Sequence, residues 1–234
     1  MSKVNEILDA SRAGNLSRVS ALLDEDPALA SAASMLGSQP AHAAYFSGHR
    51  DVFDLLLSRG VSLDPGLCAE LGMLDRVRAA VEANPELVAV FGPQGSTLLH
   101  RASYWGQTAA ASYLLERGAD PNAPTRDNFL QIRPLGCAVA TPDVPSPSDS
   151  EDTVLELVSL LLQRGADVNG RRRDGLTALH GAAYRGHLRV IAYLLEHGGD
   201  PGIRGYDGAG PHAGQSARDL ALAQSQEEAA VILA

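Results

Sequence analysis

The sequence predicts an all-α solenoid built from about seven stacked helix-turn-helix units, with the terminal units acting as caps. A pattern of short apolar helical runs and glycines recurs along the chain, and a longer period relates two N-terminal stretches. Aromatic residues make up only 5% of the chain while alanine is abundant, which favours thin, closely packed helices over one thick core. One short helix pair cannot bury its apolar face alone, so such units must stack.

The recurring pattern starts at a histidine in three places. The segments read HAAYFSGH from His42, HRASYWGQ from His100 and HGAAYRGH from His180, with five residues between that histidine and a glycine. An apolar run and a second glycine follow each segment, and glycine commonly ends a helix. Asp, Asn, Gly and Pro then supply turn chemistry. A further copy without the histidine starts at Pro134, so the pattern marks another helix pair there.

A longer repeat relates two stretches of the N-terminal half. Residues from about 10 to 64 and from about 68 to 122 match at an offset of 58, and each begins with a degenerate helix pair and continues with a fuller one. The matched positions are Gly14 with Gly72, Pro27 with Pro85, His42 with His100, Gly48 with Gly106, and Gly60 with Gly118. Five matches at one offset are hard to obtain by chance, so these stretches are two copies of one double unit.

The stretch DGLTALHGAAYRGHLRVIAYLLEHGGDP at 174–201 resembles the ankyrin repeat almost throughout. Weaker copies are STLLHRASYWGQTAAASYLLERGADPN and QPAHAAYFSGHRDVFDLLLSRG, so the resemblance covers essentially the whole chain. It implies a helix-turn-helix and a hairpin-like loop in each unit, stacked as a curved solenoid.

The spacings divide the chain into units within one expected domain, 1–234. The units are expected at about 1–31, 32–65, 66–89, 90–122, 123–169, 170–202 and 203–234. The first and last are the caps, and the short units one and three end in DP or NP rather than GAD.

Unit five is longer than its neighbours. Gly118 to Gly165 spans 47 residues, whereas Gly165 to Gly198 spans 33. The surplus of 14 falls near 141–153, TPDVPSPSDSEDT, where prolines and acidic residues oppose both helix and strand. The segment is either a surface insertion tolerated because loop length costs little, or a binding or regulatory finger. The sequence leaves both readings open.

The recurring histidines are expected to be structural. In the ankyrin repeats that the chain resembles, the Thr and His of a T-x-x-H motif hydrogen-bond near the start of the first helix and brace the adjoining loops. The residues at these positions are Thr97, His100, Thr177, His180 and His42. Gln39 stands where His42 would have its threonine, which puts that brace in doubt. The later histidines, His49 and His187, lie past the glycine and share no helix face with the first, which argues against a metal or catalytic pair.

No catalytic, cofactor or metal motif is present. The Walker spacing, GxGxxG, HExxH, CxxC and GxSxG are all absent, and the two cysteines are too few for a zinc site or a disulfide framework. The formal charge of −9 argues against nucleic-acid and acidic-membrane binding. With no signal core and no apolar run approaching a membrane span, we expect a cytoplasmic protein that is no enzyme, needs no cofactor and is monomeric when free.

A protein partner is the expected ligand. The resemblance implies contact through loop tips and the exposed, concave side of the first helices, where the two positions before the glycine are commonly variable. Aromatic residues and arginine occupy these positions, and an arginine-rich loop follows at 171–173; both residue types are enriched in binding hot spots. The candidate contacts are Phe46, Tyr104, Trp105, Tyr184, Arg185, Arg171, Arg172 and Arg173. Packing of the aromatic side chains against a neighbouring unit or against the 141–153 insertion is the alternative.

Further arginines precede other first helices. Arg126 and Arg133 lie before that of unit five and Arg204 before that of unit seven, so stacking would align a basic ridge, partly offset by aspartates. The sequence therefore predicts a non-catalytic protein–protein interaction scaffold whose partner it does not identify. The alternatives are a regulatory or inhibitory subunit of an enzyme, an enzyme with an improvised site, and a self-assembling structural protein.

Overall fold

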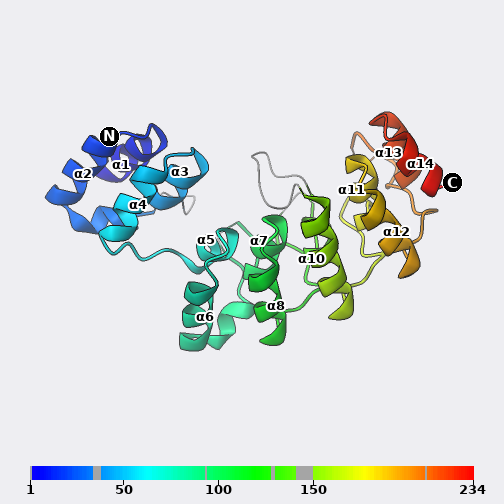
Figure 1. Cartoon of the computed structure of the whole chain (residues 1–234), viewed down its shortest axis with the longest axis horizontal. Helices are drawn as coiled ribbons and strands as arrows, with labels where there is room; N and C mark the ends of the chain where they lie inside the picture. The colour runs from blue at the N-terminus through cyan, green and yellow to red at the C-terminus, as the bar shows by residue number, and fades with distance from the viewer. Residues whose placement is uncertain (1, 34–37, 93, 128–129, 141–149, 209) are drawn as a thin grey trace. The chain divides into compact units, whose positions relative to one another are not determined.

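The computed structural model describes residues 2–33, 38–92, 94–127, 130–140, 150–208 and 210–234, and these residues form short helices joined by loops (Figure 1). The predicted all-α class of consecutive helix pairs is confirmed. Across the described ranges there is no β-strand, only an isolated antiparallel bridge between Arg204 and Ser216.

The chain divides into two compact units, Met1–Leu67 and Cys68–Ala234. The helices that lie wholly in the first are α1 (Lys3–Arg12), α2 (Leu16–Glu25), η1 (Pro27–Ser31), α3 (Pro40–Phe46) and α4 (Arg50–Ser58). Helix α1 packs against α2 and α3, and α4 packs against α2 and α3. Ile7, Leu22 and Leu56 are fully buried between them, so apolar residues at helical spacing make this core.

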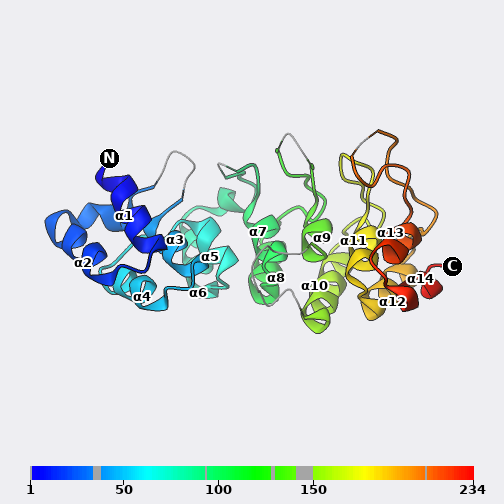
Figure 2. The same cartoon turned by 90° about the horizontal axis from the view of Figure 1, so that it is seen from above.

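The second unit continues the pairing. After α5 (Pro65–Glu70), which crosses the division, its helices are α6 (Leu74–Ala83), η2 (Pro85–Val88), α7 (Leu98–Tyr104), α8 (Thr108–Glu116), α9 (Pro134–Ala138), α10 (Glu151–Gln163), α11 (Ala178–Arg185), α12 (Leu188–Glu196), α13 (Ala217–Ala223) and α14 (Glu227–Ile232). The first helices α7, α9, α11 and α13 follow one another in a row, and the second helices α8, α10, α12 and α14 form a layer beside them (Figure 2). Each pair buries its apolar side against the next, as stacked repeats require.

Glycine makes the turn possible inside several pairs, whereas Ser225 takes the left-handed conformation between α13 and α14. Gly186 ends α11 in the left-handed region, at φ 68°, which glycine adopts without steric cost. A Cβ on Gly186 would also come within 2.1 Å of Oε1 of Gln226, so the Gln226 side chain of the next pair would have to move to admit a larger residue. His187 then forms the N-cap of α12, as His49 does for α4.

The loops between pairs hydrogen-bond to one another. Within one loop, the backbone N–H of Thr125 donates to the carbonyl of Ile132 at 2.8 Å, which is a hairpin-like closure. Between loops, backbone N–H groups donate to the carbonyl groups of the preceding loop, with Arg126 to Gly95 at 2.7 Å, Arg173 to Leu130 at 2.8 Å and Tyr206 to Asp174 at 2.8 Å. The loops therefore stack in register with the helix pairs.

Two asparagines couple successive loops through their side chains. Nδ2 of Asn122 donates to the carbonyl of Gly165 at 2.8 Å, and its Oδ1 accepts from the N–H of Asp167 at 2.7 Å. Asn169 repeats both bonds one unit later, with Gly198 and Asp200. The corresponding position in the next loop holds a glycine, Gly202, which has no side chain to continue this ladder.

The segment expected as an insertion near 141–153 ends earlier than predicted, because α10 already begins at Glu151. Residues 151–153 form the first turn of α10, where Oε1 of Glu151 accepts from the N–H of Arg189 at 2.7 Å and Asp152 forms an ion pair with Arg189. Residues 141–149 lie outside the described residues. The division of the single predicted domain into seven units stays a prediction.

Candidate functional site

The threonine–histidine motif of α7 is held by hydrogen bonds on both ring nitrogens. The backbone N–H of Thr97, the N-cap residue, donates to Nδ1 of His100 at 3.2 Å, and the Thr97 hydroxyl lies 2.8 Å from the same nitrogen. On the other side, Nε2 of His100 lies 2.9 Å from the carbonyl oxygen of Ala123 and 3.2 Å from that of Ile132. Because a backbone N–H can only donate, Nδ1 must accept and Nε2 carries the proton. The ring thus ties the start of α7 to both arms of the following loop.

His180 repeats only the Nδ1 contacts at the start of α11, because its buried Nε2 has no hydrogen-bond partner among the described residues. The N–H of Thr177 donates to its Nδ1 at 3.2 Å, and the Thr177 hydroxyl lies 3.0 Å away. Burial lowers the pKa of His180 to about 4, although the nearby carbonyl groups of Gln215 and Ile203 oppose that shift. Burial is also the main cause of the lowered pKa of His100. Both rings are therefore neutral at pH 7.

In the first unit, Gln39 occupies the threonine position before His42. Its Nε2 donates to the carbonyl of Ser62 at 3.1 Å, and its Oε1 accepts from the N–H of Asp64 at 3.1 Å. The Gln39 side chain thus bonds the loop after α4 from the N-cap of α3. His42 lies against Phe46, with ring centroids 4.6 Å apart.

The histidines do not gather with other possible metal ligands. In the part of the chain that the structure describes, no group of three or more His, Cys, Asp and Glu side chains is placed to hold a metal ion. Burial raises the pKa of Cys137 to about 12, so this thiol is protonated at neutral pH and is a poor nucleophile.

The aromatic residues predicted as partner contacts stand at the ends of first helices. Tyr104 is the last residue of α7 and Trp105 is its C-cap, and their rings meet edge to face with centroids 5.6 Å apart. Both side chains are partly exposed. Phe46 ends α3 in the first unit and is also partly exposed. Within the second unit, α9 lies between α7 and α11, so Trp105 and Tyr184 come from first helices that are not neighbours (Figure 2).

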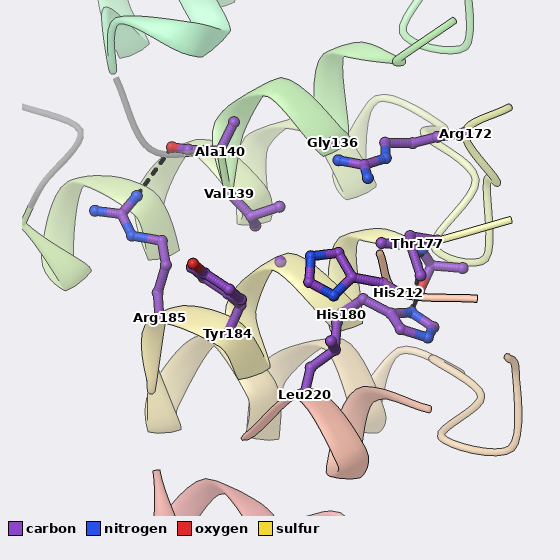
Figure 3. Close-up of a pocket in the computed structure, with 12 residues that line it drawn as sticks. Gly136, Val139, Ala140, Arg172, Thr177, His180, Tyr184, Arg185, His212 and Leu220 are labelled. Atoms are coloured by element: carbon purple, nitrogen blue, oxygen red, sulfur yellow. Dashed lines mark hydrogen bonds between the residues drawn. The ribbon is translucent and has the colours of Figure 1, made fainter. Parts of the chain in front are cut away.

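Tyr184 and Arg185, at the end of α11, border a pocket with a volume of about 230 Å³ (Figure 3). Tyr184 is 42% exposed, so its ring is available to a ligand rather than part of the core. Arg185 extends toward the end of α9, where its Nη1 donates to the carbonyl of Ala140 at 3.0 Å. A cation is favourable at a helix C-terminus, and this bond holds Arg185 at the edge of the pocket.

Helix α9, which lines the pocket through Gly136, is short and lacks the histidine of its neighbours. Gly136 occupies the position that corresponds to His100 and His180, three residues after the N-cap. No imidazole therefore extends from α9. At the nearby contact with α11, a Cβ on Gly181 would come within 2.7 Å of Cγ2 of Val139, so the two helices approach closely there.

The opposite wall comes from the loops before α11 and α13. Figure 3 shows the imidazole of His212 between Tyr184 and Thr177, with the guanidinium of Arg172 on the far side from Arg185. The centroids of the His212 and Tyr184 rings are 6.2 Å apart, edge to face. Nδ1 of His212 lies 3.0 Å from Oε1 of Gln215.

The arginine-rich loop is only partly a basic ridge. Arg172 binds Asp174 through Nε and Nη2, with Nε 3.0 Å from Oδ1. Burial acts to raise the pKa of Asp174, but the hydrogen bond and charge of Arg172 outweigh it and lower that pKa. Arg171 lies over the ring of Tyr206 at 5.3 Å, and Arg173 is exposed. The predicted ridge is therefore partly neutralised and partly used for packing between loops.

Arginines before the neighbouring helices are engaged in the same way. Arg133 donates to the carbonyl of Arg171, Arg204 forms an ion pair with Asp219 at 3.0 Å, and Arg126 lies 3.9 Å over the ring of Phe91. The contacts of Arg133 and Arg126 join successive loops, whereas that of Arg204 ties its own loop to α13, so these arginines contribute to packing as well as to surface charge.

Sequence reasoning missed the pocket and the asparagine ladder. His212 sits in an irregular loop whose course no spacing indicates, and Ala140 is too small to stand out. Gly136 in place of the histidine was the available signal for the pocket. The recurrence of Asn122 and Asn169 three residues after the alanine that follows the helix-ending glycine was the signal for the ladder.

Comparison with known proteins shows the family. Residues 7–125 match a family model described as ankyrin repeats (3 copies), and residues 150–195 match one described as ankyrin repeats (many copies). The first match alone covers half of the chain. The chain therefore belongs to the ankyrin-repeat family, in which repeats are generally protein–protein interaction modules and typically non-catalytic.

Relatives among known proteins differ widely in kind. The chain is similar to alpha-latrocrustotoxin-Lt1a of Latrodectus tredecimguttatus, with 31% identity over 138 residues, 59% of this chain and 9% of that protein. It is similar to the B-cell lymphoma 3 protein homolog of Mus musculus, with 38% identity over 111 residues, 47% of this chain and 22% of that protein. It is also similar to the probable E3 ubiquitin-protein ligase XBOS32 of Oryza sativa, with 27% identity over 202 residues, which are 82% of this chain and 37% of that protein.

The chain thus spans no more than 37% of the length of these three relatives. None of the helices in the described ranges is long and apolar enough to cross a membrane.

Proposed function

We propose that this chain is a non-catalytic scaffold that binds a protein partner through the exposed ends of its first helices and the adjoining loops. The observation that carries the proposal is Tyr184, whose ring is 42% exposed beside Arg185 at the mouth of a pocket. Tyrosine, tryptophan and arginine are the residue types enriched at binding hot spots. The Tyr104–Trp105 pair supplies a second aromatic contact on the same row of first helices.

The neutral, hydrogen-bonded histidines support a binding role over a catalytic one. Both ring nitrogens of His100 lie within hydrogen-bond distance of protein groups, so this ring is already engaged in holding the loops. His180 lines the pocket and is held through its Nδ1, which accepts from the N–H of Thr177. We further propose that the chain is cytoplasmic and monomeric when free, and that it binds neither nucleic acid nor membranes.

A second candidate is a regulatory or inhibitory unit of an enzyme. It is favoured by relatives that carry an enzyme's name, such as the probable E3 ubiquitin-protein ligase, of which this chain spans 37%, and the serine/threonine-protein kinase TNNI3K of Mus musculus, of which it spans 13%. In this case the partner bound at the same surface is an enzyme or an enzyme's substrate.

Affinity capture from the source cell, followed by mass spectrometry, identifies the partner, and variants of the chain then test where that partner binds. We expect Tyr184→Ala and Trp105→Ala each to weaken binding of the captured partner by about 2 kcal/mol, the usual loss at a hot spot. Melting curves control for unfolding, because Trp105 is only partly exposed. If both variants stay folded and bind the partner with the same affinity as the wild-type chain, the site assignment is contradicted. An assay of the partner's catalytic activity with and without the chain separates the scaffold from the regulatory unit.

A further inference from the structure

The pocket beside Tyr184 is too small for a cofactor and suits side chains of a peptide. Sites for small molecules and cofactors typically have volumes of about 300–1,000 Å³. The volume of about 230 Å³ lies below that range. The pocket opens at the end of a first helix, on the side where Tyr184 is exposed, so a segment of another protein can place one or two side chains in it.

Apolar atoms form much of the lining. Val139 and Ala140 come from the end of α9, Leu176 from the loop before α11, and Leu220 from α13. Val139, Leu176 and Leu220 are buried, so their positions are set by the core and do not need a ligand to order them. An apolar side chain entering here would exchange water for a preformed apolar surface.

The charged groups of the lining are cationic. They are the guanidinium groups of Arg172 and Arg185, and the lining residues that the structure describes include no carboxylate. This contrasts with the whole chain, whose formal charge is −9. A cationic pocket on an acidic protein favours an anionic group over a cationic one.

Arg172 has donors to spare for such a group. Asp174 takes its Nε and Nη2 and holds the guanidinium in place. A guanidinium carries five N–H groups, and within the described residues its Nη1 has no hydrogen-bond partner. Since Arg172 lines the pocket, Nη1 can donate to a carboxylate of a ligand while the pair with Asp174 stays intact.

We propose that this pocket recognises an extended peptide segment of the partner in which an apolar side chain adjoins an Asp or Glu. The apolar side chain seats against Val139, Ala140 and Tyr184, and the carboxylate accepts from Nη1 of Arg172. This inference rests on the proposed function, because it names the kind of segment that the binding surface takes. It goes beyond the proposed function because it names one pocket and one kind of peptide, an apolar side chain next to a carboxylate.

The test uses peptides selected from a random display library on the full chain. We expect an enriched motif with an apolar residue next to Asp or Glu. Fluorescence polarisation with one selected peptide then gives Kd for each variant. Ala140→Leu fills the pocket without removing the carbonyl that binds Arg185, and should weaken binding about tenfold, which corresponds to 1.4 kcal/mol. The matched control is Ala109→Leu, which adds the same atoms at an exposed position of α8 and should leave Kd unchanged.

A double-mutant cycle measures the interaction between the carboxylate of the peptide and Arg172. Replacing the acidic residue of the peptide by its amide should weaken binding to the wild-type chain about tenfold, and this penalty should vanish in Arg172→Gln. Arg189→Gln, which removes an exposed arginine on α12, should preserve the penalty. Because the acidic residue is changed in the peptide, the wild-type result does not depend on how well a variant folds.

The outcomes separate this inference from the proposed function. If selected peptides bind but neither Ala140→Leu nor the amide peptide changes Kd, the pocket is not the recognition site. Loss of binding in Trp105→Ala would then still support the proposed surface. If no peptide is enriched, the pocket takes no such segment and the inference is wrong, while the affinity capture of a folded partner decides the proposed function independently.

Discussion

Acidification from pH 7 to pH 4 should destabilise the second unit through His180. This ring is buried, its Nδ1 accepts from the N–H of Thr177, and burial lowers its pKa to about 4 from an ordinary 6.5. In the unfolded chain the ring takes a proton near pH 6.5, whereas in the folded chain it does so only near pH 4. The unfolded state therefore binds more protons between these values, and stability falls as the pH falls.

The size of the effect follows from the two pKa values. Their difference, 6.5 minus about 4, is about 2.5 units, and each unit corresponds to 1.36 kcal/mol, so His180 accounts for about 3 kcal/mol. This stability is fully present above pH 6.5 and is lost by about pH 4. His100 acts in the same direction, because burial also lowers its pKa. The lowered pKa of Asp174 matters only at lower pH, since a carboxylate whose pKa is depressed loses its contribution below its ordinary value.

Urea denaturation at a series of pH values measures this loss. The single tryptophan, Trp105, lies in the same unit as His180 and reports its unfolding by fluorescence. His180→Gln should be less stable at pH 7 but should lose about 3 kcal/mol less than wild type between pH 7 and pH 4. His197→Gln, which removes an exposed histidine of the same helix pair, should follow the wild-type curve. Equal losses in wild type and His180→Gln would refute this reasoning.

Three further results are expected. A chelator should leave the melting curve unchanged; a lower melting temperature restored by zinc would revive a metal role for the histidines. Asn169→Ala should lower the free energy of unfolding by about 1–3 kcal/mol, because it removes two hydrogen bonds to the next loop, whereas Asn5→Ala should have little effect; equal effects in chemical denaturation would count against the ladder. Arg101→Ala should cost about 3 kcal/mol or more, because Nη1 of Arg101 lies 2.6 Å from Oε1 of the buried Glu70; a loss below 1 kcal/mol would mean that water solvates the carboxylate.

Much of the fold could be predicted because each unit repeats the same local physics. Helix-ending glycines such as Gly186 mark the turns directly, since the left-handed conformation excludes most other residues. The threonine and histidine at 97 and 100 lie three residues apart, so the geometry of one helix turn brings them together whatever surrounds them. Local sequence therefore determines where each helix pair starts and stops.

The candidate site was predictable only in part. Tyr184 and Arg185 could be singled out because their position in the unit is defined by the following glycine. Whether their side chains meet solvent depends on the neighbouring units, which also decide the partial exposure of Trp105. The arginine-rich loop shows the same limit: the sequence places the charges, but the pairing of Arg172 with Asp174 depends on side-chain conformations.

The sequence by itself determined the family, the all-α class and the Thr–His contacts at the start of α7 and α11, because these depend on residues a few positions apart. Tertiary structure alone decided the pocket. Its walls come from Ala140, Tyr184 and His212, which belong to different helix pairs and meet only after stacking. The space between them is lined by Gly136, where α9 lacks the histidine of its neighbours, and by Gly181 and Val139 at their close contact. Such a space depends on how neighbouring units fit together, which no single repeat encodes.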